Sequence, residues 1–409
     1  MKKNYLKISV LAAVVLLVAS CGDSKTKSGI PTVRVEQVLD GGVEMRLSEL
    51  AKSIEYIPLE TCDDVLLGTA IQLVNAGDNN LIIDRRGNFA ALYDKDGKFL
   101  RTIGTQGKGS QELEQFKRGN YEDENDAFLI MTYRKAVRFD SEGKYINHFE
   151  LEKFSNGTAT FSYMGNDKYL VYHQKGNIMK NELEEFISLS NTQGDSLNTL
   201  AGEKVRYTSI QSTYDAKGEI SSINVRKSPV GTYLVGDQLR IVSPEIDTIK
   251  SIGIDLKPVA TYVIDYGNHK MLPDFSNEMK SLTLNHDKYL ETEQNIFWTF
   301  AFPEGDFKYG YKPWRNSKRL HGRAIFNIKD KSFKAMNKYP YYDAIGIIND
   351  LDGEAGYPFW PVNIYKGAMY QILDALTFME YAELSDSPKM KEVAAGLNEN
   401  SNPVLVVVR

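Results

Sequence analysis

The sequence lacks the features of several protein classes. Its 42% hydrophobic and 25% charged residues are an ordinary globular balance, which excludes whole-chain disorder, collagen-like repeats and a polytopic membrane protein. The formal net charge is −5 and no helix carries a basic stripe, so we do not expect nucleic acid as a partner. The 31 glycines, 13 prolines and 24 tyrosines favour a β-rich, turn-rich protein. A length of 409 residues predicts two domains or one large repeat architecture.

Catalytic and metal-binding motifs are also missing. None of the five histidines stands four residues from another or near a cysteine, so no zinc site can be assigned. The acidic segments 94–98 and 349–353 do not continue to the spaced acids and distal Glu of a calcium loop. No G-x-S-x-G elbow supports a serine nucleophile, so catalytic residues stay unassigned. We expect neither a metal nor a cofactor.

The first 20 residues have the form of an export signal. Three lysines precede an apolar run over residues 8–19, which is too short to span a membrane as a helix. The run ends in the sequence VASC at residues 18–21, and small residues before a cysteine resemble the lipobox of bacterial lipoproteins, whose cysteine is acylated. We therefore expect residues 1–20 to be a lipoprotein signal peptide, Cys21 to carry the lipid, and residues 21–31 to be a flexible tether. An ordinary signal peptide with an incidental cysteine is the alternative.

Cys62 is the one cysteine that remains once Cys21 is acylated. A single thiol cannot form an intrachain disulfide, even in an oxidising compartment. No catalytic motif surrounds Cys62, so we interpret it as a structural or incidental residue. Removal of residues 1–20 takes away three lysines and no acid, which gives the mature chain a formal side-chain charge of −8.

Units of four short strands recur at a period near 45 residues. The turns at residues 94–98 and 140–144 each lie between two short β-prone segments and start 46 residues apart. Looser copies of the turn occur at residues 190–195, 243–247 and 329–332. Two further apolar segments precede the first turn, so each repeat holds four strands. This spacing is typical of a β-propeller; a β-sandwich with similar hairpins is the alternative.

The count of repeats predicts an all-β fold over residues 32–409, a six-bladed β-propeller with four antiparallel strands per blade. Five repeats are complete, and the sixth is split between the two ends of the chain. Its strands are expected at residues 362–365, 368–373 and 404–408, with the fourth at 54–59. Closure of the last blade by both ends removes the open edges of the ring. A proline at the start and a glycine near the end of residues 388–397 predict a short helix inserted into this blade.

Five short segments also carry a family pattern. They are residues 56–61 (YIPLET), 104–109 (GTQGKG), 349–353 (NDLDG), 359–361 (FWP) and 402–408 (NPVLVVV). Together they resemble a large family of six-bladed β-propeller lipoproteins from Bacteroides-type bacteria, over nearly the whole mature chain and most weakly at residues 200–345. The resemblance implies the propeller fold and a place in the cell envelope, and it carries no catalytic residue. Because no run of acids follows Cys21, we prefer a periplasm-facing anchor to the cell surface.

One face of such a propeller is expected to carry the binding site. Turns between second and third strands and links between blades share this face, which we call the loop face; the hairpin turns named above lie on the opposite one. The candidate ligand-binding residues are Arg85, Arg86 and Arg134, then Tyr311, Trp314 and Arg315 in an insertion over residues 303–322, and Trp360. Basic and aromatic residues suit an anionic ligand such as an acidic sugar. The alternative is that the aromatic side chains pack the insertion onto the rim.

Two classes of function stay open. The first is a binding or scaffolding lipoprotein, held at the membrane by its lipid, that recognises a glycan or an envelope protein. The second is a hydrolase or lyase acting on polysaccharide, with acid and base residues from different blades meeting at the central channel. We favour binding because no motif argues for catalysis.

Overall fold

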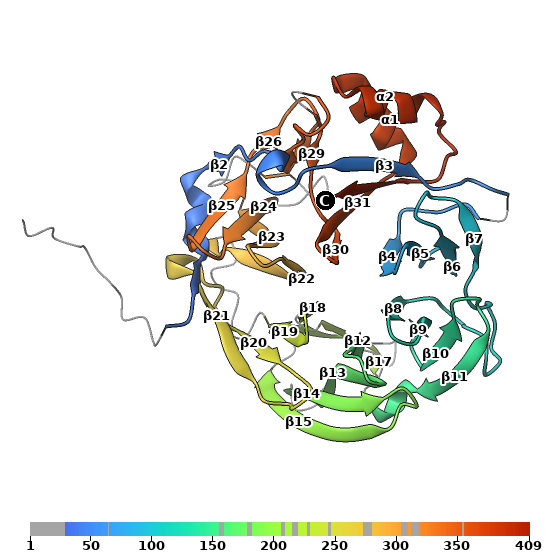
Figure 1. The fold of residues 1–409 in the computed structure, drawn as a ribbon. Helices are drawn as coiled ribbons and strands as arrows, with labels where there is room; N and C mark the ends of the chain where they lie inside the picture. Colours follow the sequence, from blue (N-terminus) through green and yellow to red (C-terminus); the bar gives the residue numbers. More distant parts are fainter. Residues whose placement is uncertain are drawn as a thin grey trace, which may run out of the picture. The chain divides into compact units, whose positions relative to one another are not determined.

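Six β-sheets form a ring in the unit Pro31–Arg409, as Figure 1 shows. We call each sheet a blade and number the blades along the chain from the first complete one. This computed structural model describes residues 29–63, 65–154, 159–177, 182–205, 209–214, 220–226, 230–243, 247–272, 280–303, 310–311, 319–353 and 356–409. The predicted six-bladed propeller is confirmed.

The first three blades each consist of four consecutive antiparallel strands. Blade 1 contains β4 (Ile71–Ala76), β5 (Asn79–Asp84), β6 (Phe89–Tyr93) and β7 (Phe99–Thr102). Blade 2 contains β8 (Arg118–Glu122), β9 (Ala127–Met131), β10 (Lys135–Asp140) and β11 (Tyr145–Glu150). Blade 3 contains β12 (Thr160–Tyr163), β13 (Lys168–Asn177), β14 (Glu182–Asn191) and β15 (Ser196–Val205). The first strand of each blade lies nearest the centre of the ring in Figure 1.

Blades 4 and 5 have a fifth strand, which the sequence did not predict. Blade 4 contains β18 (Gly231–Val235), β19 (Gln238–Val242), β20 (Thr248–Ile252) and β21 (Val259–Asp265), and β1 (Thr32–Arg34) pairs with β21 in parallel. Blade 5 contains β22 (Thr283–Glu291), β23 (Asn295–Pro303), β24 (Arg319–Asn327) and β25 (Ser332–Met336), and β2 (Gly42–Val43) pairs with β25 in parallel. The N-terminal segment thus covers two outer edges that would otherwise be open.

Blade 6 is closed by both chain ends, as predicted. Its strand order is β3-β32-β31-β30, from the outer rim inward. The strands are β30 (Asn363–Tyr365), β31 (Ala368–Leu373), β32 (Val404–Val408) and β3 (Ile54–Pro58). The C-terminal strand is therefore paired on both sides.

The helix expected in blade 6 is one of a pair. The helix α2 (Pro388–Ala395) is the predicted one, and Ser387 caps it by accepting a hydrogen bond from the Met390 backbone at 3.0 Å. A second helix, α1 (Ala375–Leu384), precedes it and was not predicted. Asp374 caps α1 through the backbone N–H of Thr377 at 3.0 Å. In the described part of the chain, neither helix nor any other is long and apolar enough to cross a membrane.

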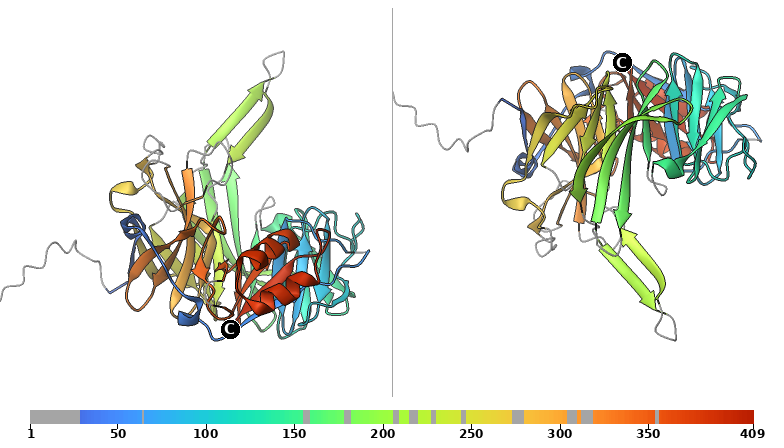
Figure 2. Two further views of the ribbon diagram at one scale, coloured as in Figure 1. Left: turned by 90° about the horizontal axis from the view of Figure 1, so that it is seen from above. Right: turned by 90° about the horizontal axis from the view of Figure 1, so that it is seen from below.

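The remaining elements are short and connect the blades. They are η1 (Val35–Asp40), η2 (Leu47–Glu49), η3 (Leu151–Lys153), η5 (Gly267–His269), β26 (Lys338–Tyr339), β27 (Ala344–Ile345), β28 (Ile347–Ile348) and β29 (Pro358–Phe359). A separate hairpin of β16 (Ser209–Tyr214) and β17 (Ile220–Arg226) projects beyond the blades in both views of Figure 2.

The turn predicted at residues 243–247 belongs to the other face of the ring. It joins β19 to β20, the second and third strands of blade 4, whereas the other four predicted turns join third and fourth strands. The reason is the tight link at residues 236–237, where Gly236 adopts a φ of 58° and makes β18 and β19 two separate strands. The turn at 243–247 therefore lies on the loop face.

The glycine of the repeated hairpin turn is explained by contact with the preceding blade. Gly97 and Gly194 have φ values of 82° and 80°, a region that favours glycine. A Cβ on Gly97 would lie 2.2 Å from the Pro58 carbonyl oxygen of blade 6, and one on Gly194 would lie 2.4 Å from the Phe149 ring of blade 2. The turn thus fits against the outer strand of the neighbouring blade.

The core consists of six apolar clusters, and each fills the interface between two neighbouring blades. Successive residues of a strand point to opposite sides. Ile82 therefore packs against blade 6 and Ile83 against blade 2. Stability of the ring is shared among these interfaces.

Candidate functional site

The three predicted arginines lie on the loop face of adjacent blades. Arg85 and Arg86 occupy the turn between β5 and β6, Arg134 occupies the turn between β9 and β10, and all three are exposed. Asp84 holds the first turn, because its Oδ1 accepts hydrogen bonds from the backbones of Arg86 at 2.9 Å and Gly87 at 2.8 Å. Asp84 thus fixes the backbone of the turn that carries the two exposed arginines.

An exposed aromatic residue precedes Arg134 in the same turn. Tyr133 is 58% exposed, and the Lys117 Nζ lies 4.1 Å from the centroid of its ring. Lys117 was not predicted as a site residue, although its place in the link before β8 puts it on the loop face. We call Arg85, Arg86, Lys117, Tyr133 and Arg134 the basic patch.

The predicted aromatic residues of blades 5 and 6 are placed differently. Trp360 is only 5% exposed, and its ring packs edge-on against Phe297 with centroids 5.7 Å apart. Tyr311 is partly buried against the same cluster and exchanges two backbone hydrogen bonds with His321, at 2.8 and 2.9 Å. Trp360 therefore follows the alternative prediction, in which the aromatic side chains pack onto the rim. Trp314 and Arg315 lie outside the described residues.

Sequence reasoning missed Arg323, which lies beside these two aromatic residues. Its guanidinium carbon is 5.5 Å from the centroid of the Trp360 ring, and its Nη1 donates to the Ile345 carbonyl oxygen. Burial lowers the pKa of Arg323, and the nearby phenols of Tyr311 and Tyr381 act in the opposite direction. The one available signal was a charged residue directly before the apolar run Ala324–Phe326.

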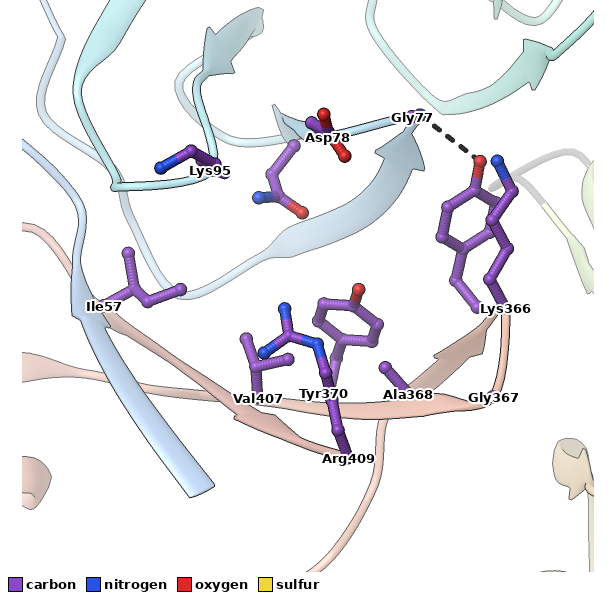
Figure 3. A pocket seen from close by; sticks show the side chains of 12 residues that line it. Ile57, Gly77, Asp78, Lys95, Lys366, Gly367, Ala368, Tyr370, Val407 and Arg409 are labelled. Atoms are coloured by element: carbon purple, nitrogen blue, oxygen red, sulfur yellow. Dashed lines mark hydrogen bonds between the residues drawn. The ribbon is translucent and has the colours of Figure 1, made fainter. Parts of the chain in front are cut away.

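A cavity of about 420 Å³ opens on the hairpin-turn face, between blades 6 and 1 (Figure 3). Its charged lining residues are Lys95, Lys366, Arg409 and Asp78, and Tyr365 and Tyr370 supply aromatic surface. Figure 3 shows that Lys95, Lys366 and Arg409 come from two separate turns and the chain end. None of these residues was among the predicted site residues.

The cations of this cavity already have partners. Arg409 pairs with Glu55 at 2.5 Å, and Lys95 pairs with Asp96 at 2.6 Å. The Lys366 Nζ lies 4.9 Å from the centroid of the Tyr365 ring. An anion would therefore have to compete with existing contacts, which makes this cavity a weaker candidate than the loop face.

The inner strands bear on the alternative of catalysis at the central channel. Amide side chains link neighbouring blades there: the Asn120 Nδ2 donates to the Phe161 carbonyl at 2.9 Å, and the Asn363 Nδ2 donates to the Asn75 Oδ1 at 2.7 Å. Among the described side chains of the inner strands, the only carboxylates are Glu122 and Glu291. Both are bound to an arginine and a tyrosine. No group of three His, Cys, Asp or Glu in the described part of the chain is placed to hold a metal.

Comparisons with known proteins agree with this architecture. A family described as "Domain of unknown function (DUF4934)" matches residues 30–409, so the chain belongs to this family. No curated protein matches the sequence. A Bacteroides fragilis protein described as exported is 13% identical with a TM-score of 0.62, over 93% of this chain and 99% of that chain. A duf4221 family member from Bacteroides vulgatus is 9% identical with a TM-score of 0.41, over 88% and 96%. The first of these shows the shared fold.

Proposed function

We propose that this chain is a binding protein of the bacterial cell envelope, anchored by a lipid on Cys21, whose loop face binds an acidic glycan. The observation that carries the proposal is the basic patch. In a protein of net negative charge, exposed cations on the loop face attract a polyanion, and the exposed Tyr133 ring under Lys117 stacks on a sugar. Trp314 and Arg315, which lie outside the described residues, are proposed as further ligand-binding residues.

Binding is better supported than hydrolysis or lyase cleavage of polysaccharide. Glycoside hydrolysis needs two carboxyl groups free to exchange protons or attack the sugar. The carboxylates found on the described inner strands are instead committed to ion pairs. We accordingly assign no catalytic role to any residue.

The basic patch gives the first test. Exposed ion pairs contribute about 0.2–1 kcal/mol each, so the triple change Arg85→Ala, Arg86→Ala and Arg134→Ala should weaken binding of oligogalacturonides about 10-fold. The salt dependence of binding should weaken as well, because fewer charges are paired. Isothermal titration calorimetry at two salt concentrations measures both effects.

A matched control removes the same charge from the opposite face, by Lys95→Ala, Lys98→Ala and Lys144→Ala. These exposed lysines lie in hairpin turns. An equal loss in both triple variants would contradict a role for the patch. Binding of an envelope protein, with no affinity for any acidic glycan, would replace the proposed ligand class.

The lipid anchor gives the second test. Cys21→Ser should abolish fatty-acid labelling and membrane fractionation without changing the melting temperature, because Cys21 precedes the unit Pro31–Arg409. Cys62→Ser is the matched control and should keep both properties. Membrane fractionation of Cys21→Ser at the wild-type level would contradict lipidation. We place the propeller in the periplasm, since no run of acids follows Cys21.

A further inference from the structure

Three arginines, Arg138, Arg240 and Arg323, lie at blade interfaces. The first two each bind a glutamate. The Arg138 Nε and Nη2 donate to the two carboxylate oxygens of Glu122 at 2.8 and 2.6 Å. The Arg240 Nε and Nη2 donate to those of Glu291 at 2.9 and 3.0 Å. In both pairs the same edge of the guanidinium holds a carboxylate through two hydrogen bonds, which is the strongest geometry for this pair.

Tyrosine hydroxyls complete both pairs. Tyr169 donates to the Glu122 carboxylate, and Tyr262 donates to the Glu291 carboxylate at 3.0 Å. A buried ion pair is stable only when its remaining polar atoms are also bonded. The two sites therefore share one pattern: a guanidinium edge, a carboxylate and a phenol.

Arg323 has the first part of this pattern without the carboxylate. Its Nε is buried and has no hydrogen-bond partner, and its Nη1 donates to the Ile345 carbonyl. Its Nη2 has no partner among the described residues, and none of their carboxylates pairs with it. The guanidinium edge that binds glutamate in Arg138 and Arg240 therefore has no described hydrogen-bond partner in Arg323. A buried charge without a counter-ion is costly, so this edge has a strong tendency to take an anion.

Phenols and an aromatic ring surround Arg323. The Trp360 ring covers the guanidinium. The phenols of Tyr311 and Tyr381 lie close enough to affect its charge, and within the described chain neither hydroxyl has a hydrogen-bond partner. Tyr381 is fixed by stacking on Tyr357, with ring centroids 5.6 Å apart. Arg323, Tyr311 and Tyr381 are each partly exposed, so part of this cluster reaches the surface.

We propose that Arg323, Tyr311, Tyr381 and Trp360 form a site for one carboxylate of a uronic acid residue. The ligand carboxylate takes the position that Glu122 and Glu291 hold against the other two arginines. This inference rests on the proposed function, because the ligand is the same acidic glycan, but its site is separate from the basic patch. A planar carboxylate matches the guanidinium edge and two phenol donors. A sulfate ester brings a further oxygen that these groups do not bind.

The test compares two ligands of equal charge, trigalacturonic acid and a trisaccharide with three sulfate esters. Wild type should bind the carboxylate ligand about 10-fold more tightly, since a buried acceptor left without a hydrogen bond costs about this much. Arg323→Lys keeps the charge but loses the two parallel N–H donors of the guanidinium. The ratio of the two affinities should therefore fall to near one, while the affinity for the sulfated ligand stays the same. Arg101→Lys, at an exposed ion pair with Glu142, is the matched control and should keep the ratio.

A second variant covers the case in which Arg323→Lys does not fold. Tyr381→Phe removes one hydroxyl and should lower the ratio several-fold. Equal affinity of wild type for both ligands would overturn the carboxylate site and leave the proposed function standing. If wild type binds neither ligand, both proposals fail. A ratio that neither variant changes would assign the selectivity to other residues and also overturn the site.

Discussion

Deletion of residues 404–409 is expected to prevent the propeller from folding. Strand β32 lies between β31 and β3 in blade 6, and it pairs with both along its whole length. All of Val404–Val408 is buried. Burial of a Val or Leu side chain contributes about 1.5–3 kcal/mol, so the loss is on the order of 10 kcal/mol. This equals the usual margin of about 5–15 kcal/mol for a whole domain.

Circular dichroism and limited proteolysis of the truncated chain measure this effect. Arg409→Ala is the control: it removes only the exposed end residue and its ion pair with Glu55, a change expected to cost less than about 1 kcal/mol. A truncated protein that melts cooperatively at the wild-type temperature would contradict closure of the ring through β32.

Much of this closure could be predicted because short apolar runs are a local signal. The run VLVVV at Val404–Val408 and the alternating segment at Ile54–Pro58 both indicate strands, and the tight turns set the period. The order of strands within a blade is not local. The turn at 243–247 was assigned to the wrong face because apolar runs do not reveal which strand is innermost. The edge strand Thr32–Arg34 was missed because three residues carry too little pattern.

The candidate site could be predicted only in part for a similar reason. Exposed arginines in loops follow from the positions of turns, so Arg85, Arg86 and Arg134 could be assigned to the loop face. The importance of Arg323 depends on what surrounds it after folding. An arginine before a short apolar run is equally consistent with an exposed position, and the missing carboxylate partner becomes visible only when the neighbouring blades are in place.

The ion pair between Arg138 and Glu122 combines residues that the sequence gives no reason to associate. Glu122 ends the innermost strand of blade 2, Arg138 lies on the third strand, and Tyr169 belongs to blade 3. The side chains of Glu122 and Arg138 are 0% and 6% exposed. The charge pair lies within blade 2, where water does not reach it, and the Tyr169 hydroxyl links blade 3 to it.

Arg138→Met is expected to destabilise the protein by about 3–5 kcal/mol, because it leaves the Glu122 carboxylate buried without its counter-ion. The double change Arg138→Met and Glu122→Gln should recover most of this loss, since the amide oxygen still accepts from Tyr169 and no charge remains. Arg323→Met is the matched comparison. It removes a guanidinium that has no described carboxylate partner and leaves only the Ile345 carbonyl without its donor, so the expected cost is about 1 kcal/mol. Urea denaturation of the variants measures these differences. An Arg323→Met loss as large as that of Arg138→Met would mean that Arg323 already has a buried counter-ion in the free protein, and this result would argue against the carboxylate site.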